Sequence, residues 1–492
     1  MSAHYAAQSP CYLNLPLELW QHVYEYLAPS DLQQGALVSK SLSLSLYCQS
    51  QIWARIDADD WVFEGIYQGL IRNAHLVRRV ACSAKSQLQV LSGPQCQSLT
   101  HLDIEKMRFL SSTVLEQILE HNYGSLQSLR IRLDRTIFLM VAEKIARMKG
   151  LKELYLQHWD GIHQEALETV LECCPQVEVL SLGHNSLYPF RLENIQQDES
   201  LSKLPLRIRS LVLDGAVIFH DELVLNLASR CPDMESLCMQ GGFGMRLSKE
   251  LATSLAILCP RLQRVNFTQQ SMTQDFFSTL FRVLPGLKEI KVAKSSLTSD
   301  DIQIMIQNCS PTLEILDIGY CTSLESRSVL SILLGCPRLQ QMDTRGVDFN
   351  PREMESTDEW VCTKLKTLHL EILLPKRAHY AEGEPERIRN SLYRQLARLN
   401  RLESLQLGAG SRDRGVNILE MSLLTGLSSL STLSRLQRLD IKRLNHAVRS
   451  AEVAWMLEHW PRLQAMGILL DTNADMELVR AVHKTNRDIL VW

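Results

Sequence analysis

The 492-residue sequence lacks the features that mark secreted, membrane or nucleic-acid-binding proteins. Its N-terminal region has no basic segment followed by an apolar one, so we expect no secretory signal. No uninterrupted apolar run reaches the roughly 20 residues that a bilayer-spanning helix needs. The formal net charge is −3, so no basic field favours nucleic acid or an anionic membrane. We therefore predict a cytoplasmic or nuclear protein with neither nucleic acid nor membrane among its partners.

Motifs for catalysis, metal binding or cofactor binding are missing as well. The sequence contains neither His-Glu-x-x-His nor Cys-x-x-Cys. Two glycine-rich segments, 241–244 and 408–410, lack the Gly-Lys-Ser/Thr ending of a phosphate-binding loop. Carboxylates and histidines are spread along the chain without forming a nucleophile–base pair. The sequence thus predicts a non-catalytic protein without a metal or cofactor.

The cysteines indicate a reducing compartment. There are 13 of them, an odd number, scattered through a long chain, which favours free thiols over disulfides. Four of them precede a proline at the same place in four similar segments: Cys174, Cys231, Cys259 and Cys336. We interpret these residues as small buried hydrophobes at helix ends, rather than as metal ligands or redox groups.

A repeated pattern of apolar residues extends over most of the sequence. The segment Leu339-x-x-Met342-x-Thr344 recurs 26 residues earlier, beginning at Leu313, and 26 residues later, beginning at Leu365. A fixed period of this size indicates a module that buries its apolar face only against its neighbours. The pattern begins at Leu99, Leu126, Leu151, Val177, Ile208, Met234, Leu262, Leu287, Leu313, Leu339, Leu365, Leu402, Leu436 and Leu463.

Each module reads as a strand followed by a helix. In residues 301–309, apolar side chains fall at helical spacing, and Thr298 with Asp301 forms a capping pair in front of them. Segments 248–259 and 326–336 repeat this design. The proline after the cysteine ends the helix and returns the chain to an extended conformation. Strands from successive modules would lie parallel, about 4.8 Å apart, with the wider helices outside, which predicts a curved α/β solenoid.

The array resembles the leucine-rich repeat, whose period is 20–29 residues, in its cysteine-containing subtype. This resemblance implies a parallel inner β-sheet with outer helices. We assign about fourteen units to residues 99–492, with insertions at 187–203, 371–398 and 408–420, which we expect to be loops. Residues 57–98 read as a helical joint and a degenerate first repeat that caps the array. Residues 1–11 are polar and small, and we expect a disordered tail.

Residues 12–56 form a small all-α module in this interpretation. Pro16 suits the first turn of a helix, and Leu19, Val23 and Leu27 follow on one helical face. The segment resembles an F-box in six short motifs: Leu15-Pro16, Glu18-Leu19-Trp20, Tyr26-Leu27, Asp31-Leu32, Val38-Ser39-Lys40 and Trp53-x-x-Ile56. It departs from the family at Leu42, where an aromatic residue is usual.

The F-box resemblance implies docking onto the Skp-type adaptor of a cullin-based, SCF-type ubiquitin ligase. Three short helices cannot bury much apolar surface alone, so their apolar side chains need a partner. The alternative is an N-terminal helical cap on the repeats. The predicted adaptor-binding residues are Leu15, Pro16, Glu18, Leu19, Val23, Leu27, Leu32, Val38, Leu42 and Trp53.

Residues between the apolar positions of each strand should face the inner side of the arc. One predicted row is Asp103, Arg130, Tyr155, Ser181, Val212, Cys238, Asn266, Lys291, Asp317, Asp343, His369, Gln406, Asp440 and Gly467. Both charge signs occur, which suits a protein partner better than nucleic acid. We expect substrate contacts at Arg130, Arg132, Tyr155, His158, Trp159, Arg345, His369, Lys376 and Arg377, although solvated repeat positions would explain the same residues.

The predicted function is therefore the substrate-recognition subunit of a ubiquitin ligase, with an unidentified protein as substrate. It would contribute positioning, not chemistry. The alternative is a leucine-rich-repeat scaffold or inhibitor with a helical cap. An enzyme that uses the repeats as a platform would need a cluster of reactive residues, which the sequence does not contain.

Overall fold

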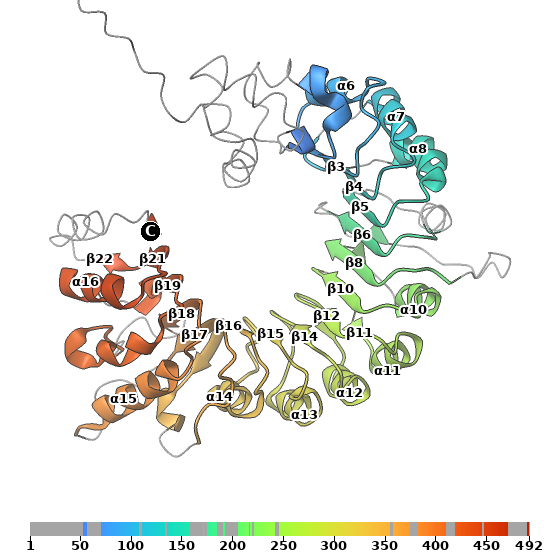
Figure 1. The fold of residues 1–492 in the computed structure, drawn as a ribbon. Coiled ribbons are helices and arrows are strands. Elements are labelled where there is room, and N and C mark those ends of the chain that lie inside the picture. Colours follow the sequence, from blue (N-terminus) through green and yellow to red (C-terminus); the bar gives the residue numbers. More distant parts are fainter. Residues whose placement is uncertain are drawn as a thin grey trace, which may run out of the picture. The chain divides into compact units, whose positions relative to one another are not determined.

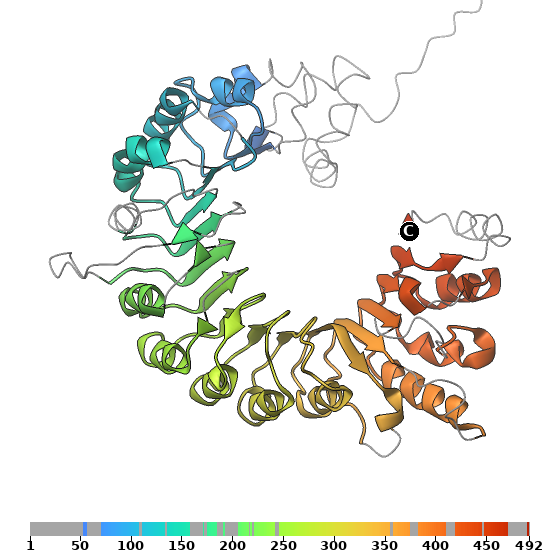
Figure 2. The same cartoon turned by 180° about the vertical axis from the view of Figure 1, so that it is seen from behind.

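The structure is a computed structural model in which the strands and helices follow one another along the chain as repeated pairs (Figures 1 and 2). The chain divides into two compact units, residues 1–186 with 206–208 and residues 187–205 with 209–492. The described residues are 53–56, 70–107, 111–132, 135–157, 171, 175–184, 190–191, 205–215, 217–218, 221–241, 246–354, 358–373, 382–409, 419–444, 447–470 and 490–491.

The first unit is a parallel ladder with helices between its strands. Each strand pairs with the next one along the chain, from β1 to β6. The strands are β1 (Arg55–Ile56), β2 (Arg79–Ala81), β3 (His101–Ile104), β4 (Ser128–Arg132), β5 (Glu153–Gln157) and β6 (Val179–His184). The helices are η3 (Ala74–Leu76), α6 (Lys85–Leu91), α7 (Ser112–His121) and α8 (Arg135–Arg147).

The second unit continues the same design with more strands. Its ladder runs in parallel through β8, β10, β12 and then β14 to β19, β21 and β23. The strands are β8 (Ser210–Gly215), β10 (Ser236–Gln240), β12 (Arg264–Asn266), β14 (Glu289–Lys291), β15 (Ile315–Asp317), β16 (Gln341–Phe349), β17 (Thr367–Ile372), β18 (Ser404–Ala409), β19 (Arg438–Asp440), β21 (Ala465–Gly467) and β23 (Leu490–Val491).

Helices cover one side of this ladder, and within the second unit the strands lie on the inner side of an arc (Figure 1). They are α10 (Asp221–Arg230), α11 (Lys249–Leu258), α12 (Phe276–Val283), α13 (Ser299–Cys309), α14 (Ser326–Gly335), α15 (Glu384–Ala397) and α16 (Ser450–His459), with the 3₁₀ helices η4 (Pro351–Met354), η6 (Leu423–Thr425), η7 (Leu427–Thr432) and η8 (Lys442–Leu444). Three short side ladders pair β7 (Phe190–Arg191) with β9 (Val217–Ile218), β11 (Arg246–Leu247) with β13 (Ser271–Met272), and β20 (Ala447–Val448) with β22 (Leu469–Leu470).

The core lies between the strands and the helices, at the positions that the repeat pattern predicts. Each of the fourteen residues that begin a repeat is at most 3% exposed. The lead-in cysteines Cys231, Cys259 and Cys336 are fully buried, as predicted, and the Sγ of Cys259 lies 3.6 Å from the carbonyl oxygens of Ala228 and Cys231. The α/β leucine-rich-repeat architecture expected from the spacing is therefore confirmed.

The three predicted helices, 248–259, 301–309 and 326–336, begin and end within two residues of their expected bounds. Thr298 caps α13, and its side chain accepts a hydrogen bond from the backbone N–H of Asp301 at 3.3 Å. The Asp301 carboxylate accepts in return from the Thr298 backbone N–H at 3.0 Å, which completes a capping box. Ser248 caps α11 by accepting from the Leu251 N–H at 3.2 Å.

Two expectations need correction. Segment 371–398 is not a loop throughout, because α15 occupies residues 384–397 and buries Ile388, Leu392 and Leu396 against the core. This helix was missed because its charge content obscures the apolar spacing. In addition, Arg55–Ile56, assigned to the end of the helical module, form β1 and pair with β2. Residues 12–52 of the predicted F-box lie outside the described residues. The side chain of Trp53, which is described, is buried, with the residue 4% exposed.

Within the part of the chain that the structure describes, no helix combines the length and apolar character needed to cross a membrane.

Candidate protein-interaction surface

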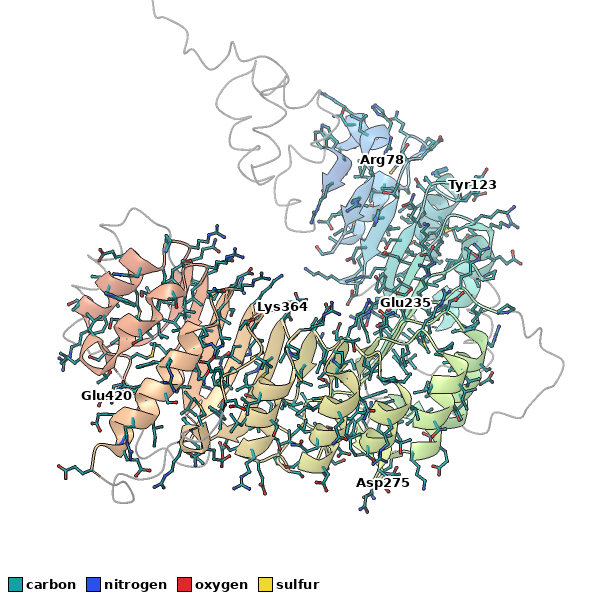
Figure 3. All side chains as sticks on the ribbon, turned by 60° about the horizontal axis from the view of Figure 1, so that its bottom comes forward. Arg78, Tyr123, Glu235, Asp275, Lys364 and Glu420 are labelled. Atoms are coloured by element: carbon teal, nitrogen blue, oxygen red, sulfur yellow. The ribbon has the colours of Figure 1, made fainter. Side chains whose placement is uncertain are left out.

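Residues of the predicted inner row are paired on adjacent strands within each unit. Strand pairing places Asp103, Arg130, Tyr155 and Ser181 side by side in the first unit. In the second unit, one register aligns Val212, Cys238, Asn266, Lys291, Asp317, Asp343, His369, Gln406, Asp440 and Gly467. Figure 3 shows the side chains of both layers, with Glu235 labelled directly before β10 and Asp275 directly before α12.

The predicted residues Arg345 and His369 meet at one carboxylate, that of Asp343. The Nε of Arg345 donates to both Asp343 oxygens, at 3.0 and 2.9 Å, and the Arg345 backbone N–H donates to Oδ1 at 3.0 Å. His369 Nδ1 lies 3.1 Å from Asp343 Oδ2. Burial alone would raise the pKa of Asp343, but the His369 and Arg345 side chains outweigh it and hold that pKa well below its usual range. Asp343 is therefore a fixed anion that orients the Arg345 guanidinium and the His369 ring.

Asp317, the neighbour of Asp343 in the row, behaves in the opposite way. Burial raises its pKa, the Gly319 N–H that donates to its Oδ1 at 3.0 Å lowers it in part, and the Asp343 charge raises it again. Within the described chain, no lysine or arginine pairs with it at ion-pair distance. The inner face thus holds one satisfied carboxylate beside one poorly satisfied carboxylate.

A second ion pair crosses the inner face nearby. Glu371 on β17 has a side chain only 4% exposed, and its Oε1 lies 2.7 Å from Nη1 of Arg443 on η8. Gly408 on the intervening β18 makes room for it, because a Cβ there would come within 3.3 Å of the Glu371 carboxylate. This pair joins strand β17 to helix η8, across 72 residues of sequence.

In the first unit, the predicted residues Arg130 and Tyr155 are also brought together. The guanidinium carbon of Arg130 lies 4.3 Å from the centre of the Tyr155 ring, a cation–π contact. Arg130 also faces Asp103 and Glu105, at 3.9 and 3.5 Å. Arg132 occupies the same strand, whereas His158, Trp159, Lys376 and Arg377 lie outside the described residues.

A left-handed backbone position repeats along the second unit, and sequence reasoning missed it. It comes three residues after the inner row, at Gly241, Gln269, Lys294, Tyr320 and Gly346, where φ is between +56° and +79°. Backbone bonds hold it from repeat to repeat: the Lys294 N–H donates to the Gly319 carbonyl at 2.7 Å, for example. The two glycines were the only available signal, because the other three residues rarely adopt this conformation.

Tyr320 occupies one of these left-handed positions, and its side chain is exposed. It is 42% exposed, and Lys294 Nζ lies 5.9 Å from its ring centre. Gly346 lies on the other side, where an added Cβ would be 2.5 Å from the ring. An exposed aromatic residue next to Arg345 has the composition of a protein-binding hot spot.

The described residues offer no group of three or more His, Cys, Asp or Glu side chains that could hold a metal ion. The arrangement therefore presents oriented charges, an aromatic ring and hydrogen-bonding groups on a firm sheet. Such a surface has the composition that is typical of protein interfaces.

No family model matches the chain. An FBD-associated F-box protein of Arabidopsis thaliana is 26% identical over 262 residues, which cover 51% of this chain and 56% of that protein. F-box/LRR-repeat protein 4 of Bos taurus is 24% identical over 268 residues, which cover 49% of this chain and 38% of that protein. A chain in the crystal structure of the yeast Rad7–Elc1 complex aligns over 93% of both chains with 14% identity and a TM-score of 0.40. The chain is thus similar to proteins named for an F-box, and its matches span no more than 56% of those relatives' length.

Proposed function

We propose that this protein is the substrate-recognition subunit of a cullin-based, SCF-type ubiquitin ligase. In this proposal, residues 12–56 dock onto a Skp-type adaptor, which links the chain to cullin, and the repeats bind a protein substrate. The observation that carries the proposal is the inner surface of β15–β17, where Asp343 holds Arg345 and His369, and where Tyr320, which follows β15, is exposed. The similarity to proteins named for an F-box supports the adaptor half.

The chain would act by holding its substrate in place for a partner enzyme. Positioning alone can contribute a large rate effect, because it converts a bimolecular step into an effectively unimolecular one. A sheet surface with side chains fixed by ion pairs suits this task, since little side-chain entropy is lost when the substrate binds.

The adaptor half is tested by a pull-down of purified Skp-type adaptor with the full chain. The informative variant combines Leu15→Asp with Pro16→Ala, and the matched control is Ile257→Ser, at a residue on α11 that is 74% exposed. We expect the wild type and the control to bind the adaptor and the double variant to lose binding. A wild type that is folded by circular dichroism but binds no adaptor would contradict the proposal and favour the scaffold alternative.

The substrate half is tested after a substrate has been captured. Arg345→Glu with His369→Ala should weaken its binding by about tenfold or more, because both side chains lie on one surface. Arg327→Glu, on α14 away from the inner row, serves as the control and should leave binding unchanged. Replacement of the charged segment 376–382 by Gly-Ser examines the second predicted patch without cutting into α15, which begins at Glu384.

A further inference from the structure

A hollow at the side of the second unit opens next to an unpaired strand edge. After the inner strands, β11 and β13 form a separate two-stranded parallel ladder. The equivalent segment of the next repeat, Ser296–Leu297, is not paired with β13 among the described residues. The ladder therefore stops at β13, and one edge of this strand remains open.

The register shows which backbone groups lie at the open edge. The Thr273 N–H donates to the Leu247 carbonyl at 2.9 Å, so Ser271 and Thr273 direct their backbone groups toward β11. Because adjacent residues of a strand alternate, the N–H and C=O of Met272 point to the opposite edge. The Met272 side chain is only 6% exposed and anchors the strand in the core.

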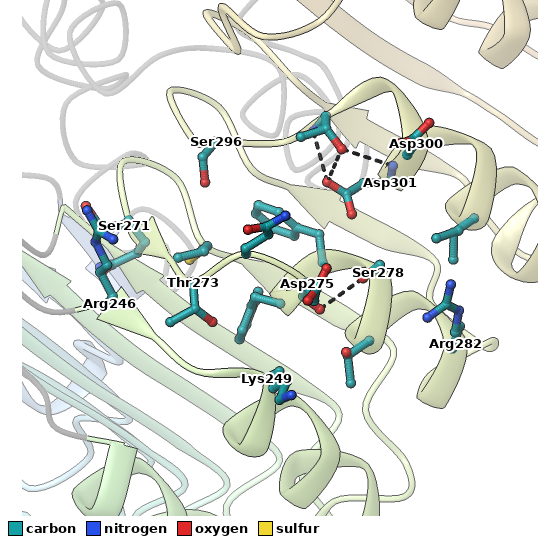
Figure 4. A pocket seen from close by; sticks show the side chains of 18 of the residues that line it. Arg246, Lys249, Ser271, Thr273, Asp275, Ser278, Arg282, Ser296, Asp300 and Asp301 are labelled. Carbon is teal, nitrogen blue, oxygen red and sulfur yellow. Dashed lines mark hydrogen bonds between the residues drawn. The ribbon is translucent and has the colours of Figure 1, made fainter.

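The hollow has a volume of about 950 Å³ and lies between β13 and the next repeat (Figure 4). Ser271 and Thr273 line one wall, and Lys294, Ser296 and Thr298 line the other. Gln270, which is 8% exposed as a residue, also lines the hollow, and no hydrogen bond joins its side-chain amide to another described residue.

The charges around the hollow are uneven. Arg246, Lys249, Arg282 and Lys294 line it without an ion-pair partner among the described residues, and the carboxylates of Asp275, Asp300 and Asp301 line it as well. In Figure 4, Arg246 lies beside Ser271 at one end, whereas Asp300 lies at the other end. Asp301 is already occupied by the capping box of α13. The strand end of the hollow is thus basic and complements an acidic group.

We propose that this hollow binds an extended, acidic peptide segment of a protein partner, which adds as a strand to the open edge of β13. The peptide backbone pairs with the N–H and C=O of Met272, the Gln270 amide supplies a further hydrogen bond, and an acidic side chain lies against Arg246 and Lys294. Backbone pairing gives affinity, and the cations select the sequence. This site is separate from the inner surface and does not depend on the ligase proposal.

The test begins with short random peptides displayed on phage and selected on the full chain. Selection is followed by counter-selection on Ser296→Trp, because an indole at this exposed wall position would fill the hollow without touching the core. The recovered peptide is then synthesised with a fluorescent label, and its Kd is measured by anisotropy. The matched control is Ser323→Trp, since Ser323 is exposed and precedes Leu324 as Ser296 precedes Leu297 one repeat earlier.

We expect acidic peptides whose affinity falls by about tenfold or more on Ser296→Trp and on Arg246→Glu with Lys294→Glu, and changes less than about twofold on the control. Hydrogen exchange at the Met272 amide should slow in the complex, which a purely side-chain contact would not cause. The proposal is overturned if counter-selection leaves no peptide, if the recovered peptides bind Ser296→Trp as tightly as the wild type, or if Met272 exchange does not change. Binding of inorganic phosphate to the hollow when no peptide is selected would instead identify a small-anion site and overturn the proposal.

Discussion

Asp317 and Asp343 occupy the same position on adjacent strands, yet their surroundings move their pKa values in opposite directions. A lowered carboxyl pKa means that the folded state favours the charged form. Asp343 therefore contributes stability above its unfolded pKa, near 4, and this stability is lost as the pH falls through the lower folded value. For Asp317 the sign is reversed, because its ionisation costs stability once the pH rises through its raised folded pKa.

Asn substitutions at these two positions should therefore have opposite effects at pH 7. Asp343→Asn removes the anion that Arg345 and His369 share and should cost about 1–3 kcal/mol in the free energy of unfolding. Asp317→Asn keeps an acceptor for the Gly319 N–H and removes the ionisation cost, so it should raise stability. Urea unfolding at pH 7 measures both changes. The Asp317→Asn gain should disappear below about pH 4, where the wild-type residue is protonated; a gain that persisted there would contradict this account.

Gly346 is the residue whose conformation the surroundings constrain most clearly. Its φ is +72°, and an added Cβ would lie 2.5 Å from the Tyr320 ring. Gly346→Ala should therefore destabilise the chain by about 1–3 kcal/mol. Gly286→Ala is the control, because a Cβ there meets nothing within 4 Å. Equal melting temperatures for the two variants would show that the left-handed position is not a source of strain.

At the scale of elements, the helix caps can be tested individually. Thr298→Ala removes the acceptor for the Asp301 N–H and leaves the Asp301 carboxylate, 9% exposed, without its hydroxyl partner. We expect a loss of about 1 kcal/mol in the free energy of unfolding, the usual cost of an N-cap. Thr298→Ser keeps the cap and should stay close to the wild type in the same denaturant titration. A similar loss in both variants would attribute the effect to the lost methyl group.

The sequence allowed strands, helices and their register to be predicted wherever local spacing determines them. Fourteen apolar positions at near-constant intervals fix both the period and the buried face, since a strand turned by one residue would expose them. α15 was not predicted, because its repeat is lengthened and charged residues interrupt its apolar face. The left-handed positions were not predicted either, because backbone bonds between repeats impose them on Gln269, Lys294 and Tyr320 against local preference.

The candidate surface was predictable in part, again because the spacing of residues determines which of them share a row. Row membership follows from spacing, so Arg130 with Tyr155 and Asp343 with His369 were expected to be neighbours. The convergence of Arg345 and His369 on one carboxylate depends on side-chain conformation, which no spacing encodes. The hollow at β13 depends on a ladder that stops, and the sequence of one repeat cannot indicate whether the next repeat pairs with it.

At the scale of the whole molecule, the reactivity of the buried cysteine thiols indicates which repeats are folded. Those buried among the described residues are Cys82, Cys96, Cys231, Cys259, Cys309, Cys321, Cys336 and Cys362. Burial raises the pKa of several of these thiols, to about 12 for Cys231 and for Cys336. Since the thiolate is the reactive form, these residues should resist alkylation in the native protein at pH 8 and react fully in denaturant.

Mass spectrometry after iodoacetamide treatment measures this protection residue by residue. We expect labelling of the buried cysteines to be slower by about a hundredfold or more in the native chain than in urea. Rapid native labelling of Cys336, between α14 and β16, would mean that the repeats open locally.

The continuous inner row of the second unit also sets a spacing for any partner that crosses it. The row from Val212 to Gly467 advances by one strand per repeat, about 4.8 Å, whereas one turn of an α-helix rises by about 5.4 Å. A partner helix laid across the strands would place successive turns over successive strands, and the mismatch would reach half a spacing after about four strands. Each repeat of the inner surface would therefore face one turn of the partner helix. A substitution in one repeat would change the contacts of that turn and leave the contacts of the neighbouring turns unchanged.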